Sequence, residues 1–314
     1  MRILLIAGGW SSEREVSING SRIVEKALFR LGHEVTFYDP AFPGEFAGDA
    51  NTGSLSGLMA LAEEHDFAFI GLHGSPGEDG LIQAMLETAG CPYQGSGPRS
   101  SFLALHKAAS KLVFRRHCLL TPDWEYLTSH PGAAWRTRLN YPLFVKSNNG
   151  GSSLHLHRVD NPEKLASVLD ELFASGLEVV IEPLIEGKEV TCAVLGDEAL
   201  PPILIEPVLG DFFDYESKYV KGGAREICPA PISAELTARI QKDALAAHRA
   251  LNLEGYSRAD FILTSTGLNY LLEINTLPGM TATSLVPQAA AVAGYDFDHL
   301  VRKLIELGLE KHAG

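Results

Sequence analysis

The first ninety residues alternate apolar, strand-like runs with amphipathic, helix-like stretches, and this alternation restricts the possible folds most strongly. Strands are predicted at residues 2–7, 34–38 and 67–72, and helices at 16–31 and 81–89, with a glycine directly after each helix. Strands separated by helices pair in parallel, because a crossover helix returns the chain to the same end of the sheet. The sequence therefore predicts an α/β protein with a parallel sheet in its N-terminal part.

Length and composition limit the classes of protein to which the chain can belong. With 314 residues, 46% of them hydrophobic, the chain can bury more than one core, so two or three domains are expected. A formal charge of −13 argues against a nucleic-acid binder, because such proteins neutralise phosphates with clustered Lys and Arg. The four cysteines form no C-x-x-C pair, and no apolar run has the length of a membrane span. We expect a cytoplasmic protein that binds neither nucleic acid nor membrane.

The middle and last parts of the chain also consist of predicted strands and helices, without an internal repeat. A helical stretch at 100–117 and the strand PLFVKS precede the Gly-rich loop NNGGSS and a second strand, LHLHRV. Helices are predicted at 162–175 and about 233–251, and strands at 189–195 and 199–206. The polar, aromatic segment DFFDYESKYVKGGAREICPA lacks periodicity, and we expect it to be a mobile lid.

Two consecutive strands near the C-terminus carry a group of oxygen donors. The segment SRADFIL contains Asp260, and the segment YLLEIN contains Glu273 and Asn275 at alternate positions. If the two strands are adjacent, the three side chains can point into one space, and such oxygen ligands suit Mg²⁺ together with phosphate oxygens. The alternative is a pair of solvated acidic residues on a sheet surface. The apolar sequence before Glu273 makes that the weaker interpretation.

A lysine followed by flexible backbone suggests a phosphate site in the middle of the chain. Lys146 lies near the end of an apolar strand and precedes two glycines and two serines, a combination that fits a triphosphate. This is not a Walker A loop, because the lysine precedes the glycines. His155 and His157 share a strand face, but without a third ligand nearby we interpret them as ordinary strand residues.

Two turns in the N-terminal part are further candidates for ligand binding. In GGWSSEREVS, Ser12 and Glu15 have the spacing of a capping box, and Glu13 lies in the same first helical turn. In HGSPGEDG, His73 and Glu78 follow an apolar strand, at the end of a parallel sheet where ligands usually bind. A turn that satisfies its own backbone is an equal alternative for any one of these residues.

Two further pairs of polar residues lie in predicted connections. Glu182 and Glu189 bracket a short connection of the type that offers adenine a backbone donor and acceptor, although surface carboxylates are the default interpretation. Lys218 and Tyr219 lie in the predicted lid, where they could close over a phosphate and a substrate carboxylate. A solvated loop is the alternative for this second pair.

Taken in order, these motifs resemble the D-alanine:D-alanine ligases of the ATP-grasp superfamily. The stretches DYESKY and NTLPGMT match that family nearly without interruption, and the resemblance covers essentially the whole chain. It implies a three-domain α/β architecture with a Rossmann-like parallel-sheet domain at 1–98, a central ATP-grasp domain at 99–184 and a C-terminal ATP-grasp domain at 185–314. The lid loop would then lie at about 207–229.

The same resemblance implies which residues hold ATP and metal. The implied Mg²⁺ ligands, for two ions that Mn²⁺ could replace, are Asp260, Glu273 and Asn275. The residues implied to contact ATP are Lys107, Lys146 and Lys218 at the phosphates and Glu182, Ile185 and Glu189 at adenine and ribose.

For the substrates, the resemblance implies that Glu13 binds the ammonium of the first D-alanine and that His73 lines that subsite. Ser152 and Tyr219 would form a hydrogen-bonded triad with Glu13 that orders the lid. Arg258 and the N–H of Gly279 would stabilise the oxyanion, and Ser284 would bind the carboxylate of the second D-alanine.

The implied activity is ATP-dependent ligation of two D-alanines through an acyl phosphate, for peptidoglycan precursor synthesis, by a cytoplasmic homodimer. The alternative within the superfamily is a ligase that joins D-alanine to D-lactate, D-serine or another amine. A non-catalytic binding protein would have lost the metal ligands or Arg258, and a nicotinamide dehydrogenase would carry a G-x-G-x-x-G fingerprint that is missing here. The chain departs from the family at Ser147, Leu154 and His155, next to the phosphate loop.

Overall fold

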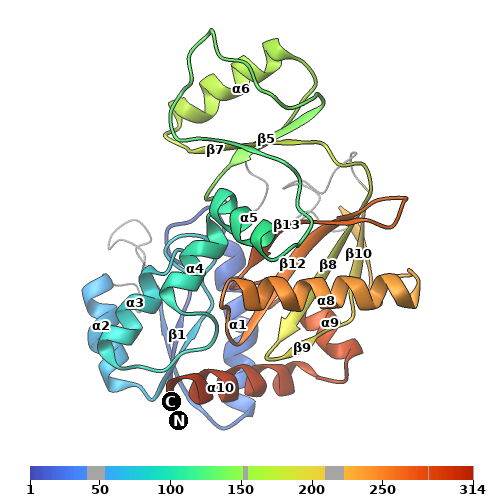
Figure 1. Cartoon of the computed structure of the whole chain (residues 1–314). Helices are drawn as coiled ribbons and strands as arrows, with labels where there is room; N and C mark the ends of the chain where they lie inside the picture. Colours follow the sequence, from blue (N-terminus) through green and yellow to red (C-terminus); the bar gives the residue numbers. More distant parts are fainter. Residues whose placement is uncertain (41–53, 151–154, 209–222, 282, 314) are drawn as a thin grey trace.

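The computed structural model describes residues 1–40, 54–150, 155–208, 223–281 and 283–313, and it contains three sheets (Figure 1). The first sheet has the order β2-β1-β3, with both pairs parallel, and is formed by β1 (Arg2–Ile6), β2 (Glu34–Tyr38) and β3 (Phe67–Ile70). Four of the five β1 residues and all of β3 are buried, as expected for parallel strands covered on both faces. The predicted parallel sheet is therefore confirmed.

Helices from both ends of the chain pack around this first sheet. They are α1 (Arg14–Arg30), α2 (Leu55–Glu64), α3 (Leu81–Ala89) and the C-terminal α10 (Phe297–Ala313). Leu300, Val301 and Leu304 of α10 belong to the same hydrophobic core as the β1 residues, and Figure 1 shows the two chain ends close together. Residues from the first strand and the last helix therefore share one hydrophobic core.

The second sheet is antiparallel, with the order β4-β7-β5-β6. Its strands are β4 (Glu125–Leu127), β5 (Leu143–Ser147), β6 (Leu156–Val159) and β7 (Val179–Pro183). The helix α6 (Pro162–Ala174) is capped by Asn161, whose side chain accepts a hydrogen bond from the Lys164 N–H. The apolar face of α6 packs against this sheet.

The third sheet contains the two C-terminal strands that carry the candidate metal ligands. The order is β11-β10-β8-β12-β13, and the short β9 (Glu198–Ala199) pairs with β8. The remaining bounds are β8 (Lys188–Leu195), β10 (Ile203–Pro207), β11 (Ala224–Ile227), β12 (Tyr256–Leu263) and β13 (Asn269–Asn275). The helix α8 (Ala234–Ala250) contacts β8, β12 and β13, and α9 (Leu285–Val292) contacts β8. The predicted pairing of β12 with β13 is confirmed, and it is antiparallel.

Four local predictions are wrong. The predicted strand at 199–206 is divided into β9 and β10, because Pro201 and Pro202 between them have no N–H to donate to a sheet. The stretch 100–117 is two helices, α4 (Pro98–Leu105) and α5 (Lys107–Arg116), because His106 has a non-helical backbone with ψ 92°. His155 lies in a turn before β6, so it shares no strand face with His157. The capping box is absent, since α1 begins after Glu13 without a side-chain cap, and Ser11 accepts the Glu13 N–H instead.

None of the helices in the described ranges combines the length and apolarity needed to cross a bilayer.

Candidate active site

A cavity of about 790 Å³ lies between the second and third sheets. One wall comes from β5, β6 and β7, and the other from β8, β10, β12 and β13. The connection from Pro183 to Glu189, which includes Ile185, closes one end of the cavity. A cavity of this size can bury a nucleotide-sized ligand.

Strand register brings the candidate metal ligands together at one side of this cavity. Asp260 on β12 is paired with Glu273 on β13, and Arg258 is paired with Asn275. The Asn275 Nδ2 donates to Asp260 Oδ2 at 3.1 Å, so the amide oxygen of Asn275 is left as an acceptor. Two carboxylates and an amide oxygen therefore lie on adjacent strands, which is the donor chemistry that Mg²⁺ prefers.

Arg258 holds the Asp260 carboxylate through two hydrogen bonds. Its Nε donates to Asp260 Oδ1 at 2.9 Å and its Nη2 to Asp260 Oδ2 at 2.8 Å, while the Thr191 hydroxyl donates to Oδ1 at 2.6 Å. Burial acts to lower the pKa of Arg258, but the Asp260 charge and hydrogen bonds outweigh it and raise that pKa above its ordinary value. The guanidinium therefore stays charged in a buried place.

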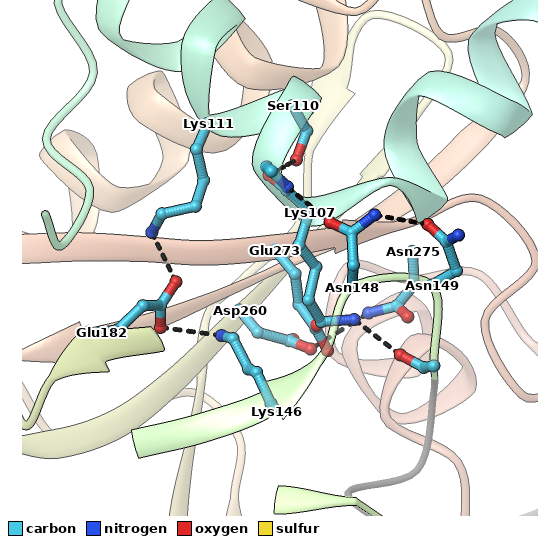
Figure 2. Close-up of polar contacts among 12 residues, drawn as sticks. Lys107, Ser110, Lys111, Lys146, Asn148, Asn149, Glu182, Asp260, Glu273 and Asn275 are labelled. Atoms are coloured by element: carbon cyan, nitrogen blue, oxygen red, sulfur yellow. Dashed lines mark hydrogen bonds and ion pairs between the residues drawn. The ribbon is translucent and has the colours of Figure 1, made fainter. Parts of the chain in front are cut away.

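Lys107 is directed at Glu273 by the N-terminus of α5 (Figure 2). Asn148 accepts the N–H of Lys107 with its backbone oxygen at 3.1 Å and the N–H of Ala108 with its Oδ1 at 3.0 Å. This cap fixes the first residue of the helix, and the Lys107 Nζ then lies 3.0 Å from Glu273 Oε2 and 2.6 Å from the Gly150 carbonyl. The lysine thus joins the metal-ligand strand to the Gly-rich loop.

Glu182, which also lines this cavity, forms ion pairs with two lysines (Figure 2). Lys111 lies 2.7 Å from Oε1 and Lys146 lies 2.8 Å from Oε2. Burial acts to raise the pKa of Glu182, but Lys146 and Lys111 outweigh it and lower that pKa. Burial lowers the pKa of Lys111 to about 8, against the opposing effect of Glu182. Two lysines around one carboxylate leave a net positive group beside the cavity.

A second group of polar side chains lies where the first sheet meets β12 and β13. His73 Nδ1 contacts the Leu277 carbonyl at 3.0 Å, and burial lowers its pKa while the charge of Glu13 opposes that shift. Burial, reinforced by the charge of Glu13, raises the pKa of Glu78 to about 8. Glu78 therefore favours its neutral form near pH 7, so this end of the site holds fewer negative charges than its sequence suggests.

Gly279 and Ser284 meet at the start of α9. A side chain at Gly279 would place its Cβ 2.8 Å from the Ser284 Oγ. The Ser284 hydroxyl accepts the Thr281 N–H at 2.9 Å and does not cap its own helix. The first N–H groups of α9 therefore have no cap from the Ser284 side chain, a geometry that favours a carboxylate ligand.

Some predicted residues lie outside the described residues. These are Ser152, Lys218 and Tyr219, together with Leu154 and most of the predicted lid. The cavity lining includes Lys107, Lys146, Glu182, Ile185, Glu189, Asp260 and Glu273. Among the described residues, no three His, Cys, Asp or Glu side chains converge on a metal site, so the metal set depends on the Asn275 amide.

Family models and known proteins agree on the class of this chain. Residues 113–306 match the model for the D-ala D-ala ligase C-terminus, and residues 47–96 match that for the D-ala D-ala ligase N-terminus. The D-alanine–D-alanine ligase of Oleidesulfovibrio alaskensis is 62% identical over 99% of this chain and 98% of its own length. The chain belongs to the D-alanine–D-alanine ligase family. The ligase of Nitratidesulfovibrio vulgaris is also 62% identical, over 98% of both chains.

Solved structures of the D-alanine–D-alanine ligase family have the same fold. The Bacillus anthracis ligase, in a complex with ATP, superposes with a TM-score of 0.85 at 35% identity over 100% of this chain and 99% of its own. The predicted α/β fold of the ATP-grasp type is therefore confirmed.

Sequence reasoning missed Lys111 and Thr191 as contributors to the site. Lys111 follows Lys107 by four residues, so helical spacing could have placed both lysines on one face. Thr191 lies opposite Asp260 on the neighbouring strand β8, which only the strand order reveals.

Proposed function

We propose that this protein joins two D-alanine molecules into D-alanyl-D-alanine and converts one ATP to ADP and phosphate for each dipeptide. The full-length similarity to ligases with this name supports the activity. The observation that carries the proposal is the cavity in which lysines face the paired strands of Asp260, Glu273 and Asn275. The product is a precursor for peptidoglycan synthesis, the role of this family.

ATP is proposed to fill the cavity between the second and third sheets. Its adenine and ribose would lie against the connection that contains Ile185 and Glu189, beside Glu182. Its phosphates would lie between Lys107 and Lys146, whose positive charges offset the charge of the transferring phosphoryl group. The Bacillus anthracis ligase was solved in a complex with ATP, which supports ATP as the ligand.

Asp260, Glu273 and Asn275 would hold Mg²⁺ next to those phosphates. Bound Mg²⁺ would offset phosphate charge and orient the transferring group. Its ligation requires Asp260 and Glu273 to share or release the hydrogen bonds that Arg258 and Lys107 make with them. The two cations therefore hold the two carboxylates in place beside the cavity.

The chemical problem is that a carboxylate is a poor electrophile, and phosphorylation by ATP converts it into an acyl phosphate that an amine can attack. Glu13 is proposed to bind the ammonium of the first D-alanine, and His73 to line the same subsite. A neutral Glu78 next to them reduces repulsion of the substrate carboxylate. Ser152, Tyr219 and Lys218 are proposed to act from the loop and lid segments, where they would exclude water from the intermediate.

Attack by the second D-alanine creates an oxyanion, for which Arg258 and the Gly279 N–H are the proposed donors. Asp260 keeps the Arg258 guanidinium charged and oriented through two hydrogen bonds. The carboxylate of the second D-alanine is proposed to bind Ser284 at the N-terminus of α9. This placement would direct its amine toward the acyl carbon.

We also propose the division of the chain into 1–98, 99–184 and 185–314, which the three separate sheets support. Assembly as a homodimer and residence in the cytoplasm remain proposals from the family resemblance.

A product assay tests the activity. The purified protein is incubated with ATP, Mg²⁺ and one of D-alanine, D-serine or D-lactate, and products are identified by mass spectrometry together with phosphate release. We expect D-alanyl-D-alanine and one phosphate per dipeptide with D-alanine alone. Background phosphate release with all three acids would refute the proposed function.

A further inference from the structure

An ion pair behind the first-substrate end of the site fixes the loop that carries Glu13. Arg14, the first residue of α1, donates from Nη1 to the Gly9 carbonyl at 2.8 Å and to Asp39 Oδ1 at 2.9 Å, and its Nη2 pairs with Asp39 Oδ2. The Arg14 side chain is 11% exposed and that of Asp39 is 2% exposed. A guanidinium bound in this forked way has one orientation, because both its direction and its plane are determined.

Asp39 also holds the backbone at the start of the same loop. Its Oδ1 accepts the Gly9 N–H at 2.9 Å, and a side chain on Gly8 would place its Cβ 2.4 Å from the carboxylate. Gly8 and Gly9 both have positive φ, 83° and 73°, which glycine adopts without strain. The Asp39 carboxylate therefore holds both ends of the loop, through the Gly9 N–H at its start and the Arg14 side chain at its end.

The rest of the loop is tied to the neighbouring substrate turn. Ser11 donates its hydroxyl to the His73 carbonyl at 2.7 Å and accepts the Glu13 N–H at 3.2 Å. The Glu13 carboxylate reaches Gly74, since its Oε2 lies 3.6 Å from the Cβ position there. Glu13 thus stands between two anchors, Ser11 before it and Arg14 after it.

The contacts of Asp39 argue against a role for its carboxylate in binding a ribose. An acid after the second strand of a nucleotide-binding parallel sheet commonly binds a ribose hydroxyl. Here both carboxylate oxygens already accept hydrogen bonds from Arg14, and the side chain is buried. The carboxylate therefore serves the protein's own loop.

We propose that Arg14 and Asp39 are positioning residues that set the place of the Glu13 carboxylate for the first D-alanine. This inference rests on the proposed function. Neither residue touches substrate. Their effect is on the affinity of the first subsite, because a small displacement of a substrate-binding group weakens the contact even when the fold is kept.

The test uses Arg14→Lys, which keeps the charge but loses the fork, and Asp39→Asn, which keeps the shape but loses the charge. Arg22→Lys is the matched control, because Arg22 lies on the same helix and pairs with Glu25 away from the loop. Hydroxylamine in excess competes with the second D-alanine as the acceptor, and D-alanine hydroxamate and dipeptide are both measured with ATP and Mg²⁺. The D-alanine concentration that half-saturates their summed formation reports on activation of the first D-alanine. Thermal unfolding is measured for each variant.

We expect Arg14→Lys and Asp39→Asn to raise the half-saturating D-alanine concentration by about tenfold or more, with the KM for ATP unchanged. Arg22→Lys should leave both constants unchanged. An unchanged half-saturation for D-alanine, with or without a lower unfolding temperature, would mean that the pair only stabilises the fold and would overturn the inference. If Asp39→Asn does not fold, Arg14→Lys decides the question alone. Absence of both hydroxamate and dipeptide with the wild-type protein would instead refute the proposed function, and the inference would fall with it.

Discussion

The guanidinium of Arg258 and the carboxylate of Asp260, two residues apart on β12, are joined by hydrogen bonds of 2.9 and 2.8 Å. The pair links two proposed functions, since Asp260 is a proposed metal ligand and Arg258 a proposed oxyanion donor. A strand places residues i and i+2 on the same face, so the sequence spacing itself makes the contact possible. The metal end and the acyl-transfer end of the site are thus adjacent on one strand.

Replacing Arg258 with alanine should abolish most turnover while leaving ATP binding largely intact. The lost side chain is a proposed oxyanion donor, and such a loss typically lowers the rate by about 10²- to 10³-fold. The measurements are kcat for dipeptide formation and the Kd for ATP, with the exposed Arg302→Ala as the control. Near-normal turnover would remove the proposed role of Arg258.

Replacing Glu182 with glutamine should destabilise the protein strongly, because Lys111 and Lys146 would be left buried without their carboxylate. Breaking a buried pair in this way typically costs about 3–5 kcal/mol. Urea unfolding of Glu182→Gln gives the free energy of unfolding, and the exposed Glu306→Gln serves as the control. Equal unfolding free energies for the two variants would show that the lysines find other partners.

The raised pKa of Glu78 predicts that the stability of the metal-free protein depends on pH. Burial raises its folded-state pKa to about 8 from an ordinary value of 4.5, so between these values the folded state retains a proton that the unfolded state has released. The stabilisation is fully present below pH 4.5 and is lost as the pH rises through about 8. Each pKa unit corresponds to about 1.4 kcal/mol.

Glu78→Gln removes this titration, so the wild-type protein should lose stability relative to the variant as the pH rises from 5 to about 9. Urea unfolding at several pH values in the presence of EDTA measures the difference, and the exposed Glu64→Gln should instead follow the wild-type protein. Parallel stability curves for wild type and Glu78→Gln would contradict the assignment.

Gly279→Ala should lower turnover because its new Cβ would lie 2.8 Å from the Ser284 Oγ and displace the start of α9. The loss should be larger for dipeptide formation, which uses both the Gly279 N–H and the proposed Ser284 subsite, than for hydroxamate formation, which uses the N–H without that subsite. Gly97→Ala is a matched control, because a Cβ at that position would meet only ordinary contacts of 3.6 Å and longer. Equal losses in both reactions would contradict binding of the second D-alanine at Ser284.

Sequence patterns predicted the elements whose periodicity or spacing is local. The alternating strands and helices of the first ninety residues and the pairing of β12 with β13 followed from apolar periodicity. Asp260 and Glu273 could be placed together because they lie on consecutive strands.

Other features depend on partners that are distant in the chain. The break at His106 has no proline or glycine signal. The His106 side chain caps α5 by accepting the Ala109 N–H, and Asn148, which follows β5, accepts the N–H groups of Lys107 and Ala108. The capping box failed because Ser11, not Ser12, accepts the Glu13 N–H while it bonds to the His73 carbonyl. The pairing of Lys111 and Lys146 with Glu182 likewise joins α5 to two strands of the second sheet. Tertiary contacts of this kind leave no pattern in the local sequence.

The most direct test of the central claim is a crystal structure of the protein with ATP and Mn²⁺, which takes the place of Mg²⁺ and gives an anomalous signal. We expect anomalous peaks within coordination distance of Asp260, Glu273 and Asn275, with the nucleotide phosphates on the same ions and the adenine beside Ile185. Metal bound elsewhere, or a nucleotide outside the cavity between the second and third sheets, would contradict it.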